Sequence, residues 1–197
     1  LNAANNAAKY FKEYKKACVA RQTLGRLIKA DGEETEYLLN VEDSIKRCRT
    51  AADINEIKEE LRKEGYIKKS GKKKTAEPKI GFRPEEYVSE DGFKILVGRN
   101  NVENDRLTMK FAAKSDLWFH VKNAAGAHVI LITEGRQVSD SALLFAAGLA
   151  AKNSSLSSSQ NVPVDYTFVK SVKKPNGAKA GMVIYENNKT LYVDPAK

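Results

Sequence analysis

Hydrophobic and polar positions alternate most clearly between residues 115 and 123. In an extended strand, successive side chains point to opposite faces, so we expect Leu117, Phe119 and Val121 on one face, toward a core. After a turn, residues 129–132 are apolar almost continuously, which is typical of a central strand covered on both sides. The other face of the first strand carries four side chains that this core does not need, and we interpret them as a candidate recognition surface: Asp116, Trp118, His120 and Lys122.

The first 66 residues show a helical rather than an alternating pattern. Residues 5–30 and 37–49 carry apolar side chains at three- and four-residue steps among many charged ones, which predicts amphipathic helices. Asp31-Gly32 between them is a turn signal, so either a helical hairpin or one kinked rod is expected. A third helix is predicted to begin at a capping box of Asp53 and Glu56 and to end at Gly65. We therefore expect a helical coiled-coil arm over residues 1–66, which either only packs or also offers a handle for RNA.

A basic linker is predicted over residues 67–79. Its core, residues 68–74, contains no apolar side chain and six charged or polar ones around a glycine. Such a run is often merely solvated. Between an arm and a domain it can also supply secondary phosphate contacts, and the candidates are Lys72, Lys73 and Lys74.

The pattern of residues 80–197 predicts an α+β domain, a mixed β-sheet with packed helices. A strand that ends in Gly98 precedes a helix that Asn100 and Glu103 can cap. Arg99 beside the helix start, together with Asn100, is a candidate phosphate contact, and an ordinary capped helix is the alternative. The remaining predicted elements are a hairpin over 86–98, a helix over 141–152 with Leu143, Leu144, Ala147 and Ala151 inward, a strand over 164–169, and a hairpin of 182–185 with 190–193.

Composition adds a charge argument. The chain of 197 residues has 34 basic and 25 acidic side chains, a net charge of +9, which suits a polyanion binder but also keeps many domains soluble. Cys18 and Cys48, the only cysteines, lie within helical patterns, which favours free thiols in a reducing compartment. No run approaches the ~20 apolar residues of a membrane span, so no membrane contact is expected. A start at Leu1 suggests a piece of a longer chain.

The candidate residues favour recognition over catalysis. Asp116, His120 and His128 match no strong metal-binding spacing, and neither cofactor nor metal is predicted. Four residues of strand separate Asp116 from His120 by ~13 Å, too far for a catalytic hydrogen bond. Trp118 instead offers a ring face for stacking an unpaired base, with Lys122 for phosphate and Asp116 or His120 for a base edge. His128 is a further candidate RNA contact. The alternative is that Trp118 fills a groove under the linker.

Several motifs together resemble a known family. The sequence is similar to the NFACT-R domain, the C-terminal RNA-binding module of the NFACT proteins, which were earlier described as fibronectin-binding proteins. Residues 6–16 also resemble the start of the coiled-coil middle region of that family. The motifs that carry the resemblance are Gly98-Arg99-Asn100-Asn101, Asn104-Asp105, Asp116 to Lys122, Gly126 to Leu131, Val164 to Thr167 and Val172 to Pro175.

The resemblance implies a cytoplasmic, ribosome-associated function in quality control. Its expected partners are the large ribosomal subunit blocked by a stalled peptidyl-tRNA, its rRNA, and tRNA, and in bacteria the family directs alanine tailing of the nascent chain. The Asp-x-Trp-x-His motif of the family falls on Asp116, Trp118 and His120. The family's N-terminal domain is absent from this chain, so tailing is not expected of it alone, and Ala125 stands where many members have proline. A fibronectin-binding adhesin is the competing interpretation.

Overall fold

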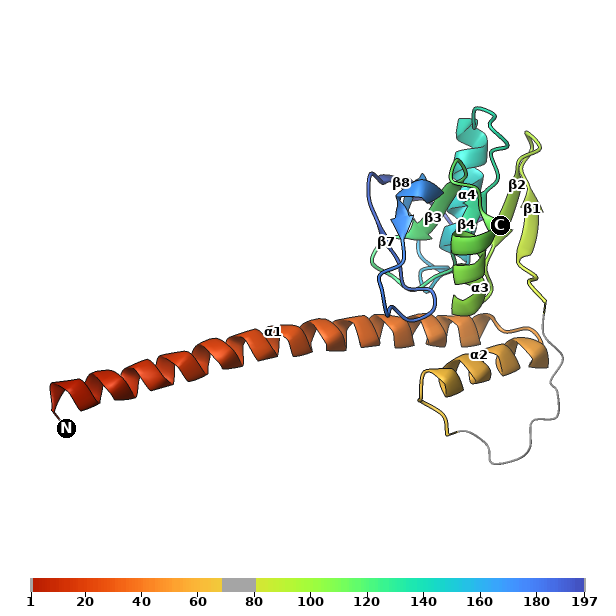
Figure 1. Ribbon diagram of the computed structural model, residues 1–197. Helices are drawn as coiled ribbons and strands as arrows, with labels where there is room; N and C mark the ends of the chain where they lie inside the picture. The colour runs from red at the N-terminus through yellow and green to blue at the C-terminus, as the bar shows by residue number, and fades with distance from the viewer. Residues whose placement is uncertain (1, 69–80, 197) are drawn as a thin grey trace. The chain divides into compact units, whose positions relative to one another are not determined.

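The computed structural model of the chain describes residues 2–68 and 81–196, so the predicted phosphate contacts Lys72, Lys73 and Lys74 lie outside the described residues. Internal contacts divide the chain into two compact units, residues 1–38 and 39–197. The helix α1 (Ala3–Arg47) runs through this division as one continuous element (Figure 1). The turn expected at Asp31-Gly32 is therefore wrong. One glycine costs a helix only about 1 kcal/mol, which many flanking turns readily offset.

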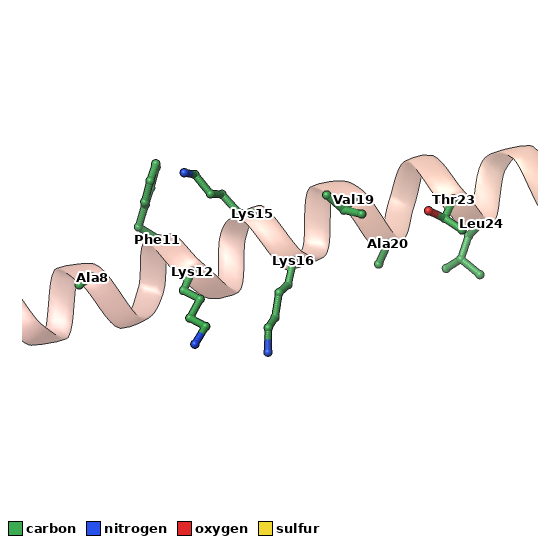
Figure 2. Close-up of a pocket in the computed structure, with 9 residues that line it drawn as sticks. All are labelled: Ala8, Phe11, Lys12, Lys15, Lys16, Val19, Ala20, Thr23 and Leu24. Atoms are coloured by element: carbon green, nitrogen blue, oxygen red, sulfur yellow. The ribbon is translucent and has the colours of Figure 1, made fainter.

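The first unit is a single helical segment with exposed apolar side chains. Figure 2 shows Phe11 and Lys15 rising from one side of the helix while Lys12 and Lys16 project from the other. The Lys15 ammonium lies 4.5 Å from the centre of the Phe11 ring, a cation–π contact. Coiled-coil pairing of this segment stays a prediction. The larger side chains left more than half exposed are Tyr10, Phe11, Tyr14, Val19, Leu24, Leu27 and Ile28.

Helix α2 (Ala51–Lys63) begins earlier than predicted. Thr50 is the N-cap, and its hydroxyl accepts from the Asp53 amide while the Asp53 carboxylate accepts from the Thr50 amide. Asp53 is thus the N3 residue of the capping box and not its N-cap, because Thr50 offers a hydroxyl cap three residues upstream. Gly65, at φ +87°, follows the end of the helix as predicted.

The second unit contains a six-stranded sheet in the order β1-β2-β4-β3-β5-β8, and the α+β class is confirmed. Every pairing between these strands is antiparallel, so the expected mixed sheet is wrong. The central strand β4 has all three residues buried, as the apolar run predicted. The strands are β1 (Glu85–Val88), β2 (Lys94–Val97), β3 (Leu117–Val121), β4 (Val129–Leu131), β5 (Val162–Phe168) and β8 (Lys189–Val193).

One face of the sheet packs against helix α4 (Asp140–Lys152), whose N-cap is Ser139. This main core includes Phe119, which is fully buried, together with Leu117 and Val121, as predicted. The helix turns its small residues inward, and Ala142 and Ala146 are fully buried whereas Leu144 is half exposed. The prediction of an inward Leu144 is wrong because alanine allows the helix to approach the strands more closely.

The opposite face is covered as well, by a second core. Helix α3 (Asn101–Arg106) and the π-helical turn Leu107–Phe111 lie on it, together with the segment that contains a 3-10 turn (Val169–Ser171), β6 (Val172–Lys173) and β7 (Ile184–Tyr185). Strand β7 pairs with β6 and β8 pairs with β5, so the predicted final hairpin is wrong. The buried residues of this second core are Leu96, Leu107, Trp118, Ile130, Val169 and Val172.

None of the helices in the described part of the chain combines the length and apolar character needed to cross a membrane. Both cysteines are free, as predicted, with Cys18 exposed and Cys48 partly buried.

Candidate functional site

The alternation of strand β3 is correct, but its second face does not meet solvent. Asp116, just before the strand, is 3% exposed, and Trp118 is fully buried. His120 is half buried, and only Lys122, just after the strand, has an exposed side chain. The interpretation of these four residues as an open recognition row is therefore wrong for Asp116 and Trp118. The 169–185 segment packs on Trp118, and the Asp116 carboxylate is turned to the Ala113 and Thr133 amides.

Asp116 holds two turns together. One carboxylate oxygen accepts a hydrogen bond from the Ala113 amide at 2.8 Å, and the other accepts from the Thr133 amide at 2.9 Å. Both oxygens are occupied by backbone donors, which fixes the start of β3 against Thr133, two residues after the end of β4. The carboxylate has no free face for a base edge.

Trp118 is the centre of an aromatic cluster. Its ring stacks on His120 at 5.7 Å between centroids and meets the edge of His128 at 5.2 Å. Tyr185, from β7, lies 4.8 Å away at a tilt. Within the described residues the indole Nε1 has no hydrogen-bond partner. The ring faces are thus already used, so the stacking platform predicted for a base is not available in this conformation.

Burial keeps both imidazoles neutral. Desolvation lowers the pKa of His120 to about 4, against weaker opposing effects from the Gly126 and Val121 backbone and from the Asp165 charge. Desolvation also lowers the pKa of His128 well below its ordinary value, and His120 adds to that effect. The His128 ring shares a hydrogen bond of 2.8 Å with the Thr108 hydroxyl. His128 is 2% exposed and therefore supports the core.

A polar network next to His120 escaped the sequence analysis. Asp165 lies opposite His120 on β5 and accepts hydrogen bonds from the Tyr185 hydroxyl at 2.9 Å and the Thr190 hydroxyl. The Lys122 ammonium lies 3.8 Å from the same carboxylate, with 43% of its side chain exposed. The alternation of β5 could have indicated Asp165, but its partners come from two strands, β7 and β8, whose pairing was predicted wrongly. His120 and Lys122 are the members of the predicted row that approach the surface.

The Arg99-Asn100 pair is engaged within the protein. Arg99 forms ion pairs with Asp53 of α2 at 2.8 Å and with Glu103 at 3.1 Å, which raise its pKa against the opposing effect of burial. Asn100 caps α3 by accepting from the Glu103 amide at 2.9 Å, so the predicted capped helix is confirmed. Its amide also donates to Glu56.

An acidic row on α2 explains this arrangement. Asp53, Glu56 and Glu60 follow one another at helical spacing and contact Arg99, Asn100 and Asn101 in turn. Three consecutive residues of the sheet domain therefore hold one face of α2. The partners are 41–46 residues apart in sequence, so local spacing could not indicate that they pair.

Packing requires a glycine at position 98. A Cβ at Gly98 would lie 2.1 Å from the side-chain oxygen of Asn104. That oxygen accepts from the His128 amide at 3.1 Å, so the Gly98 turn and β4 are joined through a buried asparagine. The described residues contain no group of three or more histidine, cysteine or acidic side chains placed to hold a metal ion.

Two family models match successive parts of the chain. Residues 1–79 match the model of the NFACT N-terminal and middle domains, and residues 83–187 match the NFACT protein RNA binding domain. The chain is 40% identical over 198 residues to the Rqc2 homolog RqcH of Streptococcus suis, with 100% of this chain and 35% of that protein covered. It is 37% identical to the Rqc2 homolog RqcH of Bacillus subtilis, with 98% of this chain and 33% of that protein covered. The chain thus spans about a third of the length of these relatives.

A solved structure shows the same fold. The C-terminal part of the fibronectin/fibrinogen-binding protein from Streptococcus suis superposes with a TM-score of 0.87 at 39% identity, covering 100% of this chain and 78% of that one. Since the RNA-binding model alone matches more than half of the chain, the chain belongs to the NFACT family.

Proposed function

We propose that this chain is the RNA- and ribosome-binding part of a ribosome-associated quality control factor in the cytoplasm. In this proposal the whole protein binds large ribosomal subunits obstructed by a stalled peptidyl-tRNA, recruits tRNA and supports C-terminal alanine tailing of the nascent chain. The observation that carries it is the match of residues 83–187 to an RNA-binding domain, within a whole-chain similarity to RqcH proteins.

Charge supports binding over catalysis. The chain has a net charge of +9, and the cationic side chains of Lys110, Lys114 and Lys122 are exposed on the sheet domain. Phosphate contacts of this kind supply the affinity of most nucleic-acid binders and make it depend on salt. The chain is accordingly proposed to act as a binding module and not as an enzyme.

The predicted site residues take two roles in this proposal. Lys122 and the half-buried His120 are proposed to reach RNA directly, and Lys72, Lys73 and Lys74 to add secondary phosphate contacts. Four further candidates, which are buried or paired, are proposed to act by holding the interface in shape: Asp116, Trp118, His128 and Asn100. Arg99 is paired with Asp53 but keeps 20% of its side chain exposed, and it is proposed to contact phosphate as well.

Co-sedimentation with isolated large ribosomal subunits tests the function. The chain is expected to pellet with the subunits at low salt and to be released as salt rises. Lys122→Gln should lower the slope of log K against log salt by roughly one unit, as loss of one phosphate contact predicts. Lys152→Gln on α4 is a charge-matched control. Failure of the parent chain to sediment at low salt would contradict the proposal.

Fibronectin binding is a second candidate, favoured by the solved structure at 39% identity that is described as part of a fibronectin/fibrinogen-binding protein. Immobilised fibronectin distinguishes the two functions. Capture that resists salt and is not displaced by RNA supports the adhesin, whereas displacement by RNA assigns the capture to the basic surface.

A further inference from the structure

A cleft lined by arginines lies where α1 ends and α2 begins. Its volume is about 250 Å³, large enough for a phosphate group with its attached sugar. Every lining residue belongs to the second unit, so the cleft is part of one compact body. Its wall carries four guanidinium groups against two carboxylates, and these charged residues are Arg47, Arg49, Arg83, Arg99, Asp53 and Glu85.

Hydrogen bonds and ion pairs to neighbouring groups fix the positions of two of these arginines. Arg47 donates to Asp43 at 2.8 Å and to the Gly98 carbonyl at 3.4 Å, with 18% of its side chain exposed. Arg99 is fixed by Asp53 and Glu103 and is 20% exposed. In each guanidinium, the buried Nη2 atom has no hydrogen-bond partner within the described residues. These two donors are covered by protein atoms, and because an unpaired buried donor is costly, an oxygen-rich anion that reaches them would satisfy them.

The other two arginines are free to close on a ligand. Arg49 is 76% exposed and only 3.7 Å from Glu85 at its nearest, a weak surface pair. The Arg83 side chain is exposed and makes no ion pair among residues 2–68 and 81–196, although its backbone amide is held by Glu103. Thr50, the N-cap of the 13-residue α2, also lines the cleft, so the positive end of the helix dipole faces the same space.

We infer that this cleft binds a phosphate group, with Arg47 and Arg99 as fixed donors and Arg49 and Arg83 as mobile ones. Carboxylates hold the fixed pair in the correct orientation, while the mobile pair supplies the charge excess. This inference rests on the proposed function in taking the phosphate from the RNA backbone. A free nucleotide presents the same group, and the experiment separates the two sources.

The test variant is Arg49→Gln with Arg83→Gln, because both side chains are exposed and their loss leaves the buried ion pairs intact. The control variant is Lys58→Gln with Lys152→Gln, which removes the same charge from exposed positions outside the cleft. Single-stranded RNA binding by fluorescence anisotropy should weaken at least about tenfold in the test variant. The slope of log K against log salt should fall by about 0.7, the value for one phosphate on a single strand.

Inorganic phosphate provides an arm that does not involve RNA. At constant ionic strength, phosphate in place of chloride should raise the Tm of the parent and of the control variant but not that of the test variant. If a mononucleotide raises the Tm of the parent as much as an RNA at the same phosphate concentration does, the cleft is assigned to free nucleotides. If the parent binds RNA and the test and control variants both bind it as tightly as the parent does, the cleft inference is overturned while the proposed function stands. If phosphate stabilises the parent but RNA does not bind, the proposed function fails and the anion site stands.

Discussion

The two imidazoles that pack against Trp118 should make the chain lose stability in mild acid. The pKa of His120 is about 4 in the folded chain against an ordinary 6.5, because burial disfavours the charged ring. The unfolded chain therefore binds a proton more readily between these values. Stability from the neutral ring is complete above pH 6.5 and is lost as the pH falls toward 4.

The size of the effect follows from the two pKa values. Linkage gives a loss of about 2.5 kcal/mol from His120 alone between pH 7.5 and pH 4.5. His128, whose pKa is lowered by burial and by His120, acts in the same direction. Asp43 opposes both, because burial raises its pKa and stabilises the protonated form at low pH. Comparison of variants removes that background.

The assay is denaturant unfolding of the parent and of His120→Gln across this pH range. Glutamine keeps a polar planar side chain but cannot titrate, so the variant should lose about 2.5 kcal/mol less on acidification. Since the chain has only two histidines, NMR titration of the two imidazole C2 protons measures their pKa values directly. A His120 pKa near 6.5, or equal acid sensitivity of parent and variant, would refute the reasoning.

Three further expectations rest on burial and packing. In a denaturant titration, Trp118→Ala and Phe119→Ala should each cost ~3–5 kcal/mol of unfolding free energy because both rings are fully buried. Phe168→Ala, at 46% exposure, should change it by under ~1 kcal/mol. An unchanged unfolding midpoint for Trp118→Ala would mean that this ring is not buried. Gly98→Ala should destabilise by ~1–3 kcal/mol through the clash with Asn104, measured by thermal unfolding, and an unchanged Tm would mean that the turn relaxes freely. Thiol titration should find two reactive cysteines, with Cys48 slower because burial raises its pKa while Cys18 is exposed; equal rates would contradict the buried environment of Cys48.

Local pattern predicted most of the elements of the sheet domain. The alternation around Phe119 located β3 and its main-core face, and the apolar run at 129–132 located the central strand. The fate of the opposite face was not predictable in the same way. Its cover is built from strands of two residues, which are too short to show a period, so Trp118 looked solvated in the sequence.

The surroundings of Arg99 were not predictable for a related reason. Its guanidinium is paired with the carboxylate of Asp53, which lies 46 residues earlier and which local spacing does not connect to it. A capping pattern, by contrast, is contained within four residues, and the cap at Asn100 was predicted correctly. Contacts across long sequence separations decided which charged residues remained available for a ligand.

The 169–185 segment lies late in the sequence, and this position has a consequence for synthesis of the chain. Leu96, Trp118 and Ile130 emerge from the ribosome long before the 169–185 segment that shields them. Until then a nascent chain exposes part of this aliphatic and aromatic surface, and the sheet lacks the pairings of β3 with β5 and of β5 with β8. Chains truncated before residue 169 therefore retain a sheet face that only α3 and the π-helical turn cover, and they should aggregate or recruit chaperones, even though the helix α4 side of the sheet has already been synthesised.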